Sequence, residues 1–308
     1  MVARGSGAQP PSGRRGAGRL AGLGLVGVAL VTLLAGCDVG DTFGHFGWPG
    51  EGITPEAHRM YDLWIGSVVA ALAVGVFVWG LIFWCVVAYR KRGDRLPPQT
   101  RYNMPLEVLY TATPVLVVAV LFYYTAIVQT DVTRVSNNPD VVVEVNAFKW
   151  NWQFNYRDEP GADAETIAST VGASDYIPVL VVPTGKKIRV EQTSRDVIHS
   201  FWVPELLYKL DVFPGNVRNT FEITIDLGAE GAYVGRCAEL CGTYHSMMNF
   251  ELRAVTWEKY QQFLAAKEDG ASTPEALQSI GEEPYAITTK PFDTDRDART
   301  FNPDGETS

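Results

Sequence analysis

The sequence predicts a two-helix transmembrane hairpin followed by an all-β sandwich domain outside the membrane. Two uncharged apolar stretches predict the hairpin: residues 63–87 and residues 109–128, which are 25 and 20 residues long. A series of short β-branched runs, separated by proline and glycine, predicts the sandwich after Pro139. The 308 residues are enough for about two domains, and the membrane part accounts for one of them.

Residues 1–36 are typical of an export signal. Four arginines precede an apolar run at 20–34 that is short and rich in small residues, as in secretory signals. The run ends in Leu-Ala-Gly-Cys37, which resembles a bacterial lipobox. We therefore expect cleavage before Cys37 and lipid attachment to its sulfur; the alternative is an ordinary signal followed by a lone cysteine. Residues 37–60 then form a short exported lead.

Residues 61–129 are expected to form the transmembrane hairpin. As a helix, the first apolar stretch would be about 37 Å long, which is enough to cross a hydrocarbon core of about 30 Å. The loop at 90–104 carries five basic residues, and such loops stay in the cytoplasm. Both ends of the hairpin therefore face outside, as the export signal also requires. Cys85 lies inside the first span, where a lone thiol most often serves packing.

Residues 130–268 are expected to form the outer β domain, with strands at 141–145, 179–182, 187–191, 220–225 and 249–255. The stretch 148–156 is expected to be one continuous strand, with an aromatic residue at every even position and hence on one face. That face is expected to fill the core, and part of it could offer electrons a path inward. The loop at 158–177 lacks apolar periodicity and is expected to be exposed. Thr256 is expected to cap a short helix that ends at Lys267.

The exported part of the chain is acidic. Residues 129–266 carry 12 basic and 18 acidic side chains, and residues 267–308 carry 4 and 10. This excess of acidic side chains favours a basic soluble partner, or it serves only to keep the domain soluble. No nucleic-acid partner is expected. Because residues 269–308 are polar, acidic and interrupted by proline, we expect them to be disordered or to lie over a partner.

The chemistry of the chain is concentrated in one loop. Cys237, Cys241, His245 and Met248 fall within twelve residues, and a second imidazole, His199, lies upstream, where it is expected to end a strand. Soft sulfur together with imidazole suits copper far better than magnesium or calcium. A mononuclear blue-copper site takes one Cys, two His and a weak axial Met. The second Cys indicates instead two coppers bridged by two thiolates, and therefore an electron-transfer protein.

The same residues are open to other interpretations. A Cys237–Cys241 disulfide suits an oxidising compartment, but it would leave His199, His245 and Met248 without a role. A zinc site of two Cys and two His is chemically possible, although zinc rarely recruits Met. Met247 competes with Met248 as the axial ligand. The sequence contains no Cys-x-x-Cys-His motif, so no c-type haem is expected.

The motif Cys-x-Glu-x-Cys-Gly-x-x-His-x-x-Met, preceded by Asp-Val-Ile-His-Ser-Phe and Lys-Trp-Asn-Trp, resembles subunit 2 of haem–copper cytochrome c oxidases. The resemblance runs from the hairpin through Val255. It implies a cupredoxin-like, Greek-key outer domain that holds the dinuclear copper centre called CuA. Cys237 and Cys241 would bridge the two coppers, and the other implied ligands are His199, His245, the thioether of Met248 and the backbone carbonyl of Glu239.

The resemblance implies three further roles. Trp150 would be the point at which electrons enter from a cytochrome c. The side chain of Glu239 would bind a magnesium ion at the junction with subunit 1. Glu107 would lie near the cytoplasmic mouth of a proton pathway into subunit 1, since acids at a membrane edge are functional candidates. Lys149, beside Trp150, disfavours a freely diffusing and strongly basic donor, and a membrane-tethered cytochrome is the alternative.

The implied function is that of the electron-accepting subunit of a proton-pumping cytochrome c oxidase, a translocase of the bacterial cell membrane. Haem and the oxygen-reducing site would be in subunit 1. Nitrous oxide reductase shares the loop motif, but it needs a large catalytic domain and no hairpin. A lipid-anchored copper carrier needs exposed, exchangeable ligands and no hairpin. A quinol-oxidase subunit 2 would lack the copper ligands.

Overall fold

The structure of the protein is a computed structural model that describes residues 45, 48, 50–94, 96, 98–161 and 163–291. All the elements named below belong to one compact unit, residues 49–308. The predicted signal, the lipobox and Cys37 lie outside the described residues, as does the end of the acidic tail.

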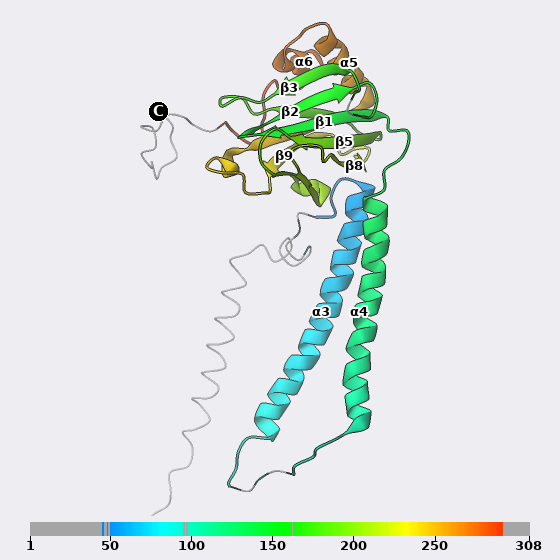
Figure 1. Ribbon diagram of the computed structural model, residues 1–308, viewed down its shortest axis with the longest axis vertical. Coiled ribbons are helices and arrows are strands. Elements are labelled where there is room, and N and C mark those ends of the chain that lie inside the picture. The colour runs from blue at the N-terminus through cyan, green and yellow to red at the C-terminus, as the bar shows by residue number, and fades with distance from the viewer. Residues whose placement is uncertain are drawn as a thin grey trace, which may run out of the picture. The chain divides into compact units, whose positions relative to one another are not determined.

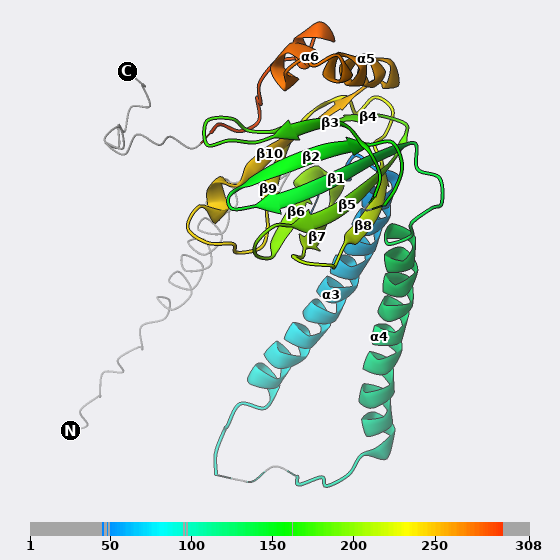
Figure 2. The ribbon, with the colours of Figure 1, turned by 45° about the horizontal axis from the view of Figure 1, so that its top comes forward.

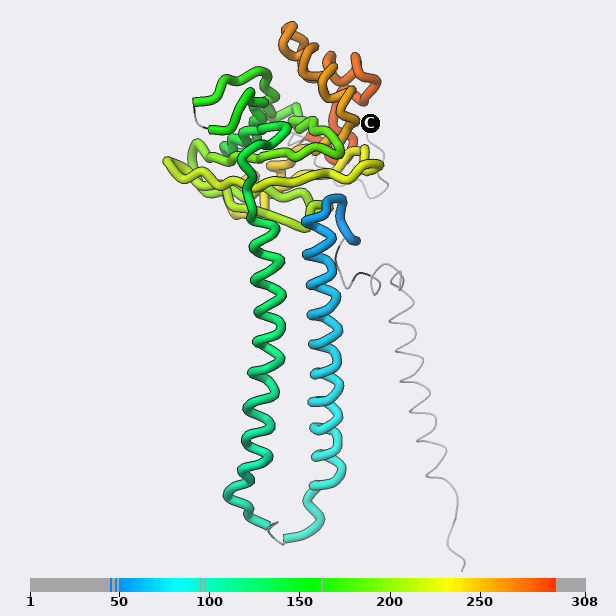
Figure 3. Tube along the Cα trace, turned by 90° about the vertical axis from the view of Figure 1, so that its right-hand side faces the viewer, coloured from blue at the N-terminus to red at the C-terminus, as the bar shows by residue number. Residues whose placement is uncertain are grey.

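Two long helices form the hairpin, α3 (Pro55–Ala88) and α4 (Met104–Val132), and they run side by side (Figures 1 and 3). Each begins at a capping side chain: Thr54 accepts a hydrogen bond from the Ala57 N–H, and Asn103 accepts one from the Leu106 N–H. α3 ends immediately before the basic loop. Both helices are long and apolar enough to cross a membrane, so the predicted hairpin is confirmed.

The outer domain consists of two five-stranded sheets (Figure 2). One sheet has the order β3-β2-β1-β5-β8 and the other β4-β10-β9-β6-β7. The pairs β1–β5 and β4–β10 are parallel and the other pairs are antiparallel. The predicted β-sandwich is confirmed. Its strands are β1 (Val141–Phe148), β2 (Asn151–Arg157), β3 (Thr166–Val171), β4 (Val179–Pro183), β5 (Lys187–Ser194), β6 (His199–Val203), β7 (Tyr208–Val212), β8 (Asn219–Thr224), β9 (Gly231–Cys237) and β10 (Asn249–Val255).

Aromatic side chains from both sheets meet in the core. Trp152, Phe154 and Tyr156 of β2 are fully buried, as expected for alternate positions of a strand that faces the core. Phe201 and Phe250, from the opposite sheet, stack with ring centroids 4.7 Å apart, and Trp152 meets Phe250 edge-on at 5.4 Å. These rings fill the space directly beneath the end of the sheet at which the sulfur-rich loop begins.

The predicted continuous strand 148–156 is wrong. β1 ends at Phe148 and pairs antiparallel with β2 through Phe148 and Asn151, so Lys149 and Trp150 form the turn between them. The Lys149 N–H donates to Oδ2 of Asp196 at 2.7 Å and fixes this turn. Alternation of aromatic and polar residues continues through the turn, which is why the sequence pattern did not reveal it.

Two other expectations about strands are corrected. The region 158–177 contains β3, an edge strand that pairs with β2. Its inward-facing residues, Ala168 and Thr170, are small or polar, so no apolar periodicity marked the strand. His199 begins β6 rather than ending a strand, because residues 195–197 form a bend just before it that leads into the sheet.

The C-terminal segment packs against the domain. Thr256 caps α5 (Trp257–Glu268), as predicted, and α6 (Thr273–Ser279) follows with a capping box formed by Ser272 and Glu275. The expectation that residues beyond 268 are disordered or lie on a partner is therefore wrong for residues 269–291. Ala276, Leu277 and Ile280 are buried, although these apolar side chains are too sparse in the sequence to predict the packing.

Candidate metal centre

Three strands bring the sulfur and imidazole side chains to one end of the second sheet. β6 pairs with β9 through Phe201 and Cys237, and β9 pairs with β10 through Arg236 and Asn249. His199 at the start of β6, Cys237 at the end of β9 and Met248 just before β10 are therefore neighbours. Two backbone hydrogen bonds close the loop at its base: Cys237 N–H to Met248 O at 3.1 Å and Ala238 N–H to Ser200 O at 2.9 Å.

The sulfur and nitrogen atoms of the cysteines and histidines lie 3.6–3.9 Å from their nearest neighbours in the cluster. The Sγ atoms of Cys237 and Cys241 are 3.9 Å apart. Nδ1 of His199 is 3.8 Å from Sγ of Cys237, and Nδ1 of His245 is 3.6 Å from Sγ of Cys241. His199 and both cysteines are buried, whereas His245, in the 3₁₀ helix His245–Met247, is half-buried. The cluster is enclosed on the core side and opens toward the surface at His245.

The positions of Met247 and Met248 show which of the two can reach the cluster as a ligand. Sδ of Met248 is 3.8 Å from Sγ of Cys241, and Met248 is fully buried. Met247 points outward and is 42% exposed. The backbone carbonyl of Glu239 lies 3.3 Å from Sγ of Cys237, while the Glu239 side chain is exposed. The structure thus brings Met248 and the Glu239 carbonyl to the cluster and keeps Met247 out of it.

The arrangement suits copper better than the alternatives. Cys237 and Cys241 are free, with sulfur atoms at 3.9 Å where a disulfide needs about 2.05 Å. A tetrahedral zinc ion takes four ligands from Cys, His and carboxylates, which would leave the buried thioether and the carbonyl unused. Two thiols, two imidazoles, a thioether and a carbonyl form a soft donor set of the kind that selects copper.

Burial also affects the protonation of the Cys241 thiol. Burial, followed by the proximity of Cys237, raises the pKa of the Cys241 thiol to about 12. Without a metal ion, Cys241 is therefore a protonated thiol at neutral pH. A metal ion that binds as a thiolate complex must displace this proton.

Asp196 orients His199 and was not assigned a role from the sequence. Its Oδ1 lies 2.8 Å from Nε2 of His199, so Nδ1 of the ring faces the sulfur atoms. Burial raises the pKa of Asp196, but hydrogen bonds from His199 and from the backbone N–H groups of Lys149 and Val197 outweigh it and hold the pKa below its usual value. The spacing Asp-x-x-His is the feature of the sequence that could have indicated this role.

Trp150 lies against the sulfur-rich loop. Its Nε1–H donates to the carbonyl of Cys241 at 3.2 Å, and its ring meets Tyr244 edge-on at 5.0 Å. A Cβ at Gly242 would lie 3.2 Å from the Trp150 ring, and Gly242 has φ of +122°, so glycine suits this position on both counts. Trp150 is half-buried and, with Tyr244 and Met247, lines a surface pocket of about 390 Å³.

Glu107 lies far from the cluster. It is in the first turn of α4, and 25 residues separate it from Val132 at the other end, or about 37 Å along the helix. Its Oε1 accepts a hydrogen bond from the Asn103 N–H at 2.9 Å, so Glu107 also caps α4.

Residues 141–255 match the family described as cytochrome C oxidase subunit II, periplasmic domain. The probable cytochrome c oxidase subunit 2 of Nocardia farcinica is 43% identical over 96% of this chain and 93% of its own length. The chain belongs to the cytochrome c oxidase subunit 2 family.

Two further relatives and one solved structure are also similar to this chain. Cytochrome c oxidase subunit 2 of Mycobacterium tuberculosis is 43% identical over 92% of this chain and 91% of its own length, and that of Corynebacterium glutamicum is 38% identical over 92% and 93%. A crystal structure of the periplasmic domain of subunit II of cytochrome oxidase from Bradyrhizobium japonicum is 27% identical over 44% of this chain and 98% of that domain, with a TM-score of 0.37.

Family membership confirms the resemblance inferred from the loop motif. This subunit 2 is part of a cytochrome c oxidase, which is an oxidoreductase, so other oxidase subunits are its partners. Its two membrane-capable helices and its periplasmic-type domain are those of a membrane protein with an extracytoplasmic domain.

Proposed function

We propose that this chain is the electron-accepting subunit of a proton-pumping cytochrome c oxidase, a translocase. It takes electrons outside the membrane from a cytochrome c or a membrane-tethered cytochrome, and passes them to haem in subunit 1, where oxygen is reduced. The observation that supports this most strongly is the cluster of soft donors at the end of a buried sheet, in contact with the half-buried Trp150.

The donor set suits two copper ions, the CuA centre. The residues that would hold the ions are Cys237, Cys241, His199, His245 and Met248, together with the carbonyl of Glu239. When bound, the two ions supply a redox centre that accepts and returns one electron at a time.

The chain holds the ligands rigidly in place and keeps water away from the site. Hydrogen bonds at the base of the loop hold Cys237 and Met248 in place, and Trp152 donates from Nε1 to the Met248 carbonyl at 3.2 Å. Phe250 and Trp152 cover the buried side of the loop. Ligands fixed in this way need little rearrangement when the charge of the site changes, which favours fast electron transfer.

Trp150 is the proposed point at which electrons enter, because it is half-buried and hydrogen-bonded to the backbone of a proposed ligand, Cys241. Trp150→Phe removes this hydrogen bond and the indole ring. In the purified oxidase complex, we expect the rate of electron uptake from reduced cytochrome c to fall at least about tenfold, which corresponds to about 1.4 kcal/mol. Stopped-flow spectroscopy of haem reduction measures this rate.

The matched control is Trp257→Phe, at the start of α5 and stacked on Tyr260, which should leave electron uptake unchanged. Equal rates in wild type and Trp150→Phe would remove Trp150 from the pathway. Equal slowing in both variants would point to a general loss of structure.

Two further assignments belong to this proposal. The exposed side chain of Glu239 supports a magnesium site shared with subunit 1. Glu239→Ala should then lower the magnesium content of the complex, and unchanged content would exclude the site.

Glu107 is the proposed acid near a proton pathway. Glu107→Gln keeps an oxygen that accepts from Asn103 but removes the charge, and should slow turnover and proton pumping; unchanged pumping would exclude this role.

Lipid attachment at Cys37 and a location in the bacterial cell membrane complete the proposal. Mass spectrometry of the purified chain would show a diacylglycerol-modified N-terminal cysteine. A mature N-terminus at any other residue would contradict it.

A further inference from the structure

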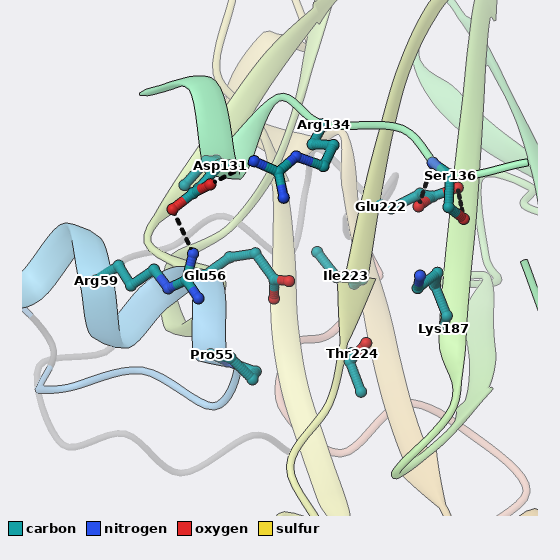
Figure 4. Close-up of a pocket in the computed structure, with 11 residues that line it drawn as sticks. Pro55, Glu56, Arg59, Asp131, Arg134, Ser136, Lys187, Glu222, Ile223 and Thr224 are labelled. Atoms are coloured by element: carbon teal, nitrogen blue, oxygen red, sulfur yellow. Dashed lines mark hydrogen bonds and ion pairs between the residues drawn. The ribbon is translucent and has the colours of Figure 1, made fainter. Parts of the chain in front are cut away.

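A polar cavity lies where the hairpin meets the β domain. It has a volume of about 200 Å³ and is lined by the first turns of α3, the end of α4 and residues of β5 and β8 (Figure 4). We call it the junction chamber. Its charged side chains include Glu56, Arg59, Asp131, Arg134 and Lys187. Since α3 and α4 are the membrane helices, the chamber lies at the level of the lipid headgroups on the outer side.

The charges in the junction chamber are only partly compensated. Asp131 accepts from Arg59 at 2.5 Å and from Arg134 at 2.8 Å, so two guanidinium groups share one carboxylate. No ion pair joins Lys187 to any residue that the structure describes. Oε2 of Glu56 is buried and has no hydrogen-bond partner among the described residues. A buried carboxylate oxygen without a donor is costly.

An apolar groove continues from the chamber along the hairpin. Arg59 and Asp131 line both spaces. The groove has a volume of about 640 Å³, and its α3 wall extends from Arg59 to Ala70 at helical spacing, with Gly66 in the middle. Eleven residues of helix rise about 16 Å, which is close to half of a hydrocarbon core of about 30 Å. The groove is therefore about as long as one leaflet of the bilayer is thick.

We propose that the groove and the junction chamber together bind one phospholipid of the outer leaflet that carries a primary amine in a zwitterionic headgroup, as in phosphatidylethanolamine. One acyl chain lies in the groove. The phosphate binds between Arg59, Arg134 and Lys187, and the ammonium group donates to Glu56.

Charge complementarity selects this class of lipid. Three cations, Arg59, Arg134 and Lys187, face three acids, namely Glu56, Asp131 and Asp62 at the mouth of the groove. The fourth acid, Glu222, is neutralised by Arg189. A site with balanced but separated charges fits a headgroup that is itself neutral with separated charges. A choline headgroup has no N–H to donate to Glu56, and an anionic headgroup has no cation for it.

The first test measures lipid retention by the purified oxidase complex. Delipidated complex is exposed to dioleoyl-phosphatidylethanolamine, dioleoyl-phosphatidylglycerol or dioleoyl-phosphatidylcholine, and tightly held lipids are counted by native mass spectrometry. Glu56→Gln should weaken retention of one phosphatidylethanolamine about tenfold, because it removes the negative charge opposite the ammonium group and leaves only a weaker hydrogen bond to a neutral oxygen. The control Glu51→Gln changes an exposed acid just before the helix and should retain it. Equal retention in both variants, or equal binding of all three lipids by wild type, overturns the proposal.

The second test fills the groove. A Cβ atom added at Gly66 would meet no atom within 4 Å, and the same holds for Gly80 of the same helix, which lies outside the groove. Gly66→Leu should therefore remove the same lipid molecule while the complex still assembles, and Gly80→Leu should retain it. If Gly66→Leu alone prevents assembly, the groove holds a helix of another subunit and the proposal is wrong. Full lipid retention in Gly66→Leu also overturns it.

Discussion

Asp196 determines which nitrogen of His199 faces the sulfur atoms. Its carboxylate binds Nε2 of His199 and, through its other oxygen, the Lys149 N–H in the turn that carries Trp150. One side chain thus positions both a proposed copper ligand and the proposed point of electron uptake. Carboxylate partners of this kind orient a ligating imidazole and increase its basicity.

The corresponding prediction concerns Asp196→Asn. The amide lacks the negative charge and presents an N–H₂ group to one of its present donors, so the His199 ring should be held less firmly. We expect copper affinity to fall about 10- to 100-fold, as measured by competition with a chromophoric chelator. Asp175→Asn, in an exposed turn, is the control. Unchanged affinity in Asp196→Asn would show that backbone geometry alone orients His199.

At the scale of elements, the C-terminal segment is bound to the strand that leads out of the metal loop. Glu251 of β10 is fully buried, pairs with Arg253, and accepts hydrogen bonds from the Ile287 N–H, the Thr288 N–H and the Thr288 hydroxyl at 2.7–2.8 Å. These contacts lie beyond residue 255, where the family match ends. The segment therefore stabilises the second sheet of the sandwich.

Deleting residues 284–308 should destabilise the outer domain, because Glu251 would keep Arg253 but lose three donors. Hydrogen bonds to charged groups are worth about 1.5–3 kcal/mol each, so we expect the free energy of unfolding to fall by about 4.5 kcal/mol or more. Urea unfolding followed by tryptophan fluorescence measures it. Deleting only residues 292–308 should have little effect, and equal stability of the two truncated chains would show that residues 284–291 add nothing.

At the scale of the whole molecule, the sequence predicted what depends on strong local patterns. The uncharged stretches and the basic loop indicated the hairpin, and the sulfur and imidazole spacing indicated the cluster. What it missed depends on tertiary contacts. The turn at Lys149 and Trp150 is held by Asp196, the polar strand β3 by pairing with β2, and the acidic C-terminal segment by the buried Glu251. None of these leaves an apolar period in the sequence.

We propose that one soft donor cluster, assembled from three strands and a loop, holds two copper ions as a single redox centre. Electron paramagnetic resonance of the full chain, purified in detergent and loaded with copper, tests it most directly. We predict hyperfine structure from one unpaired electron shared equally by two copper nuclei. A spectrum in which the electron is localised on a single copper nucleus would contradict the account.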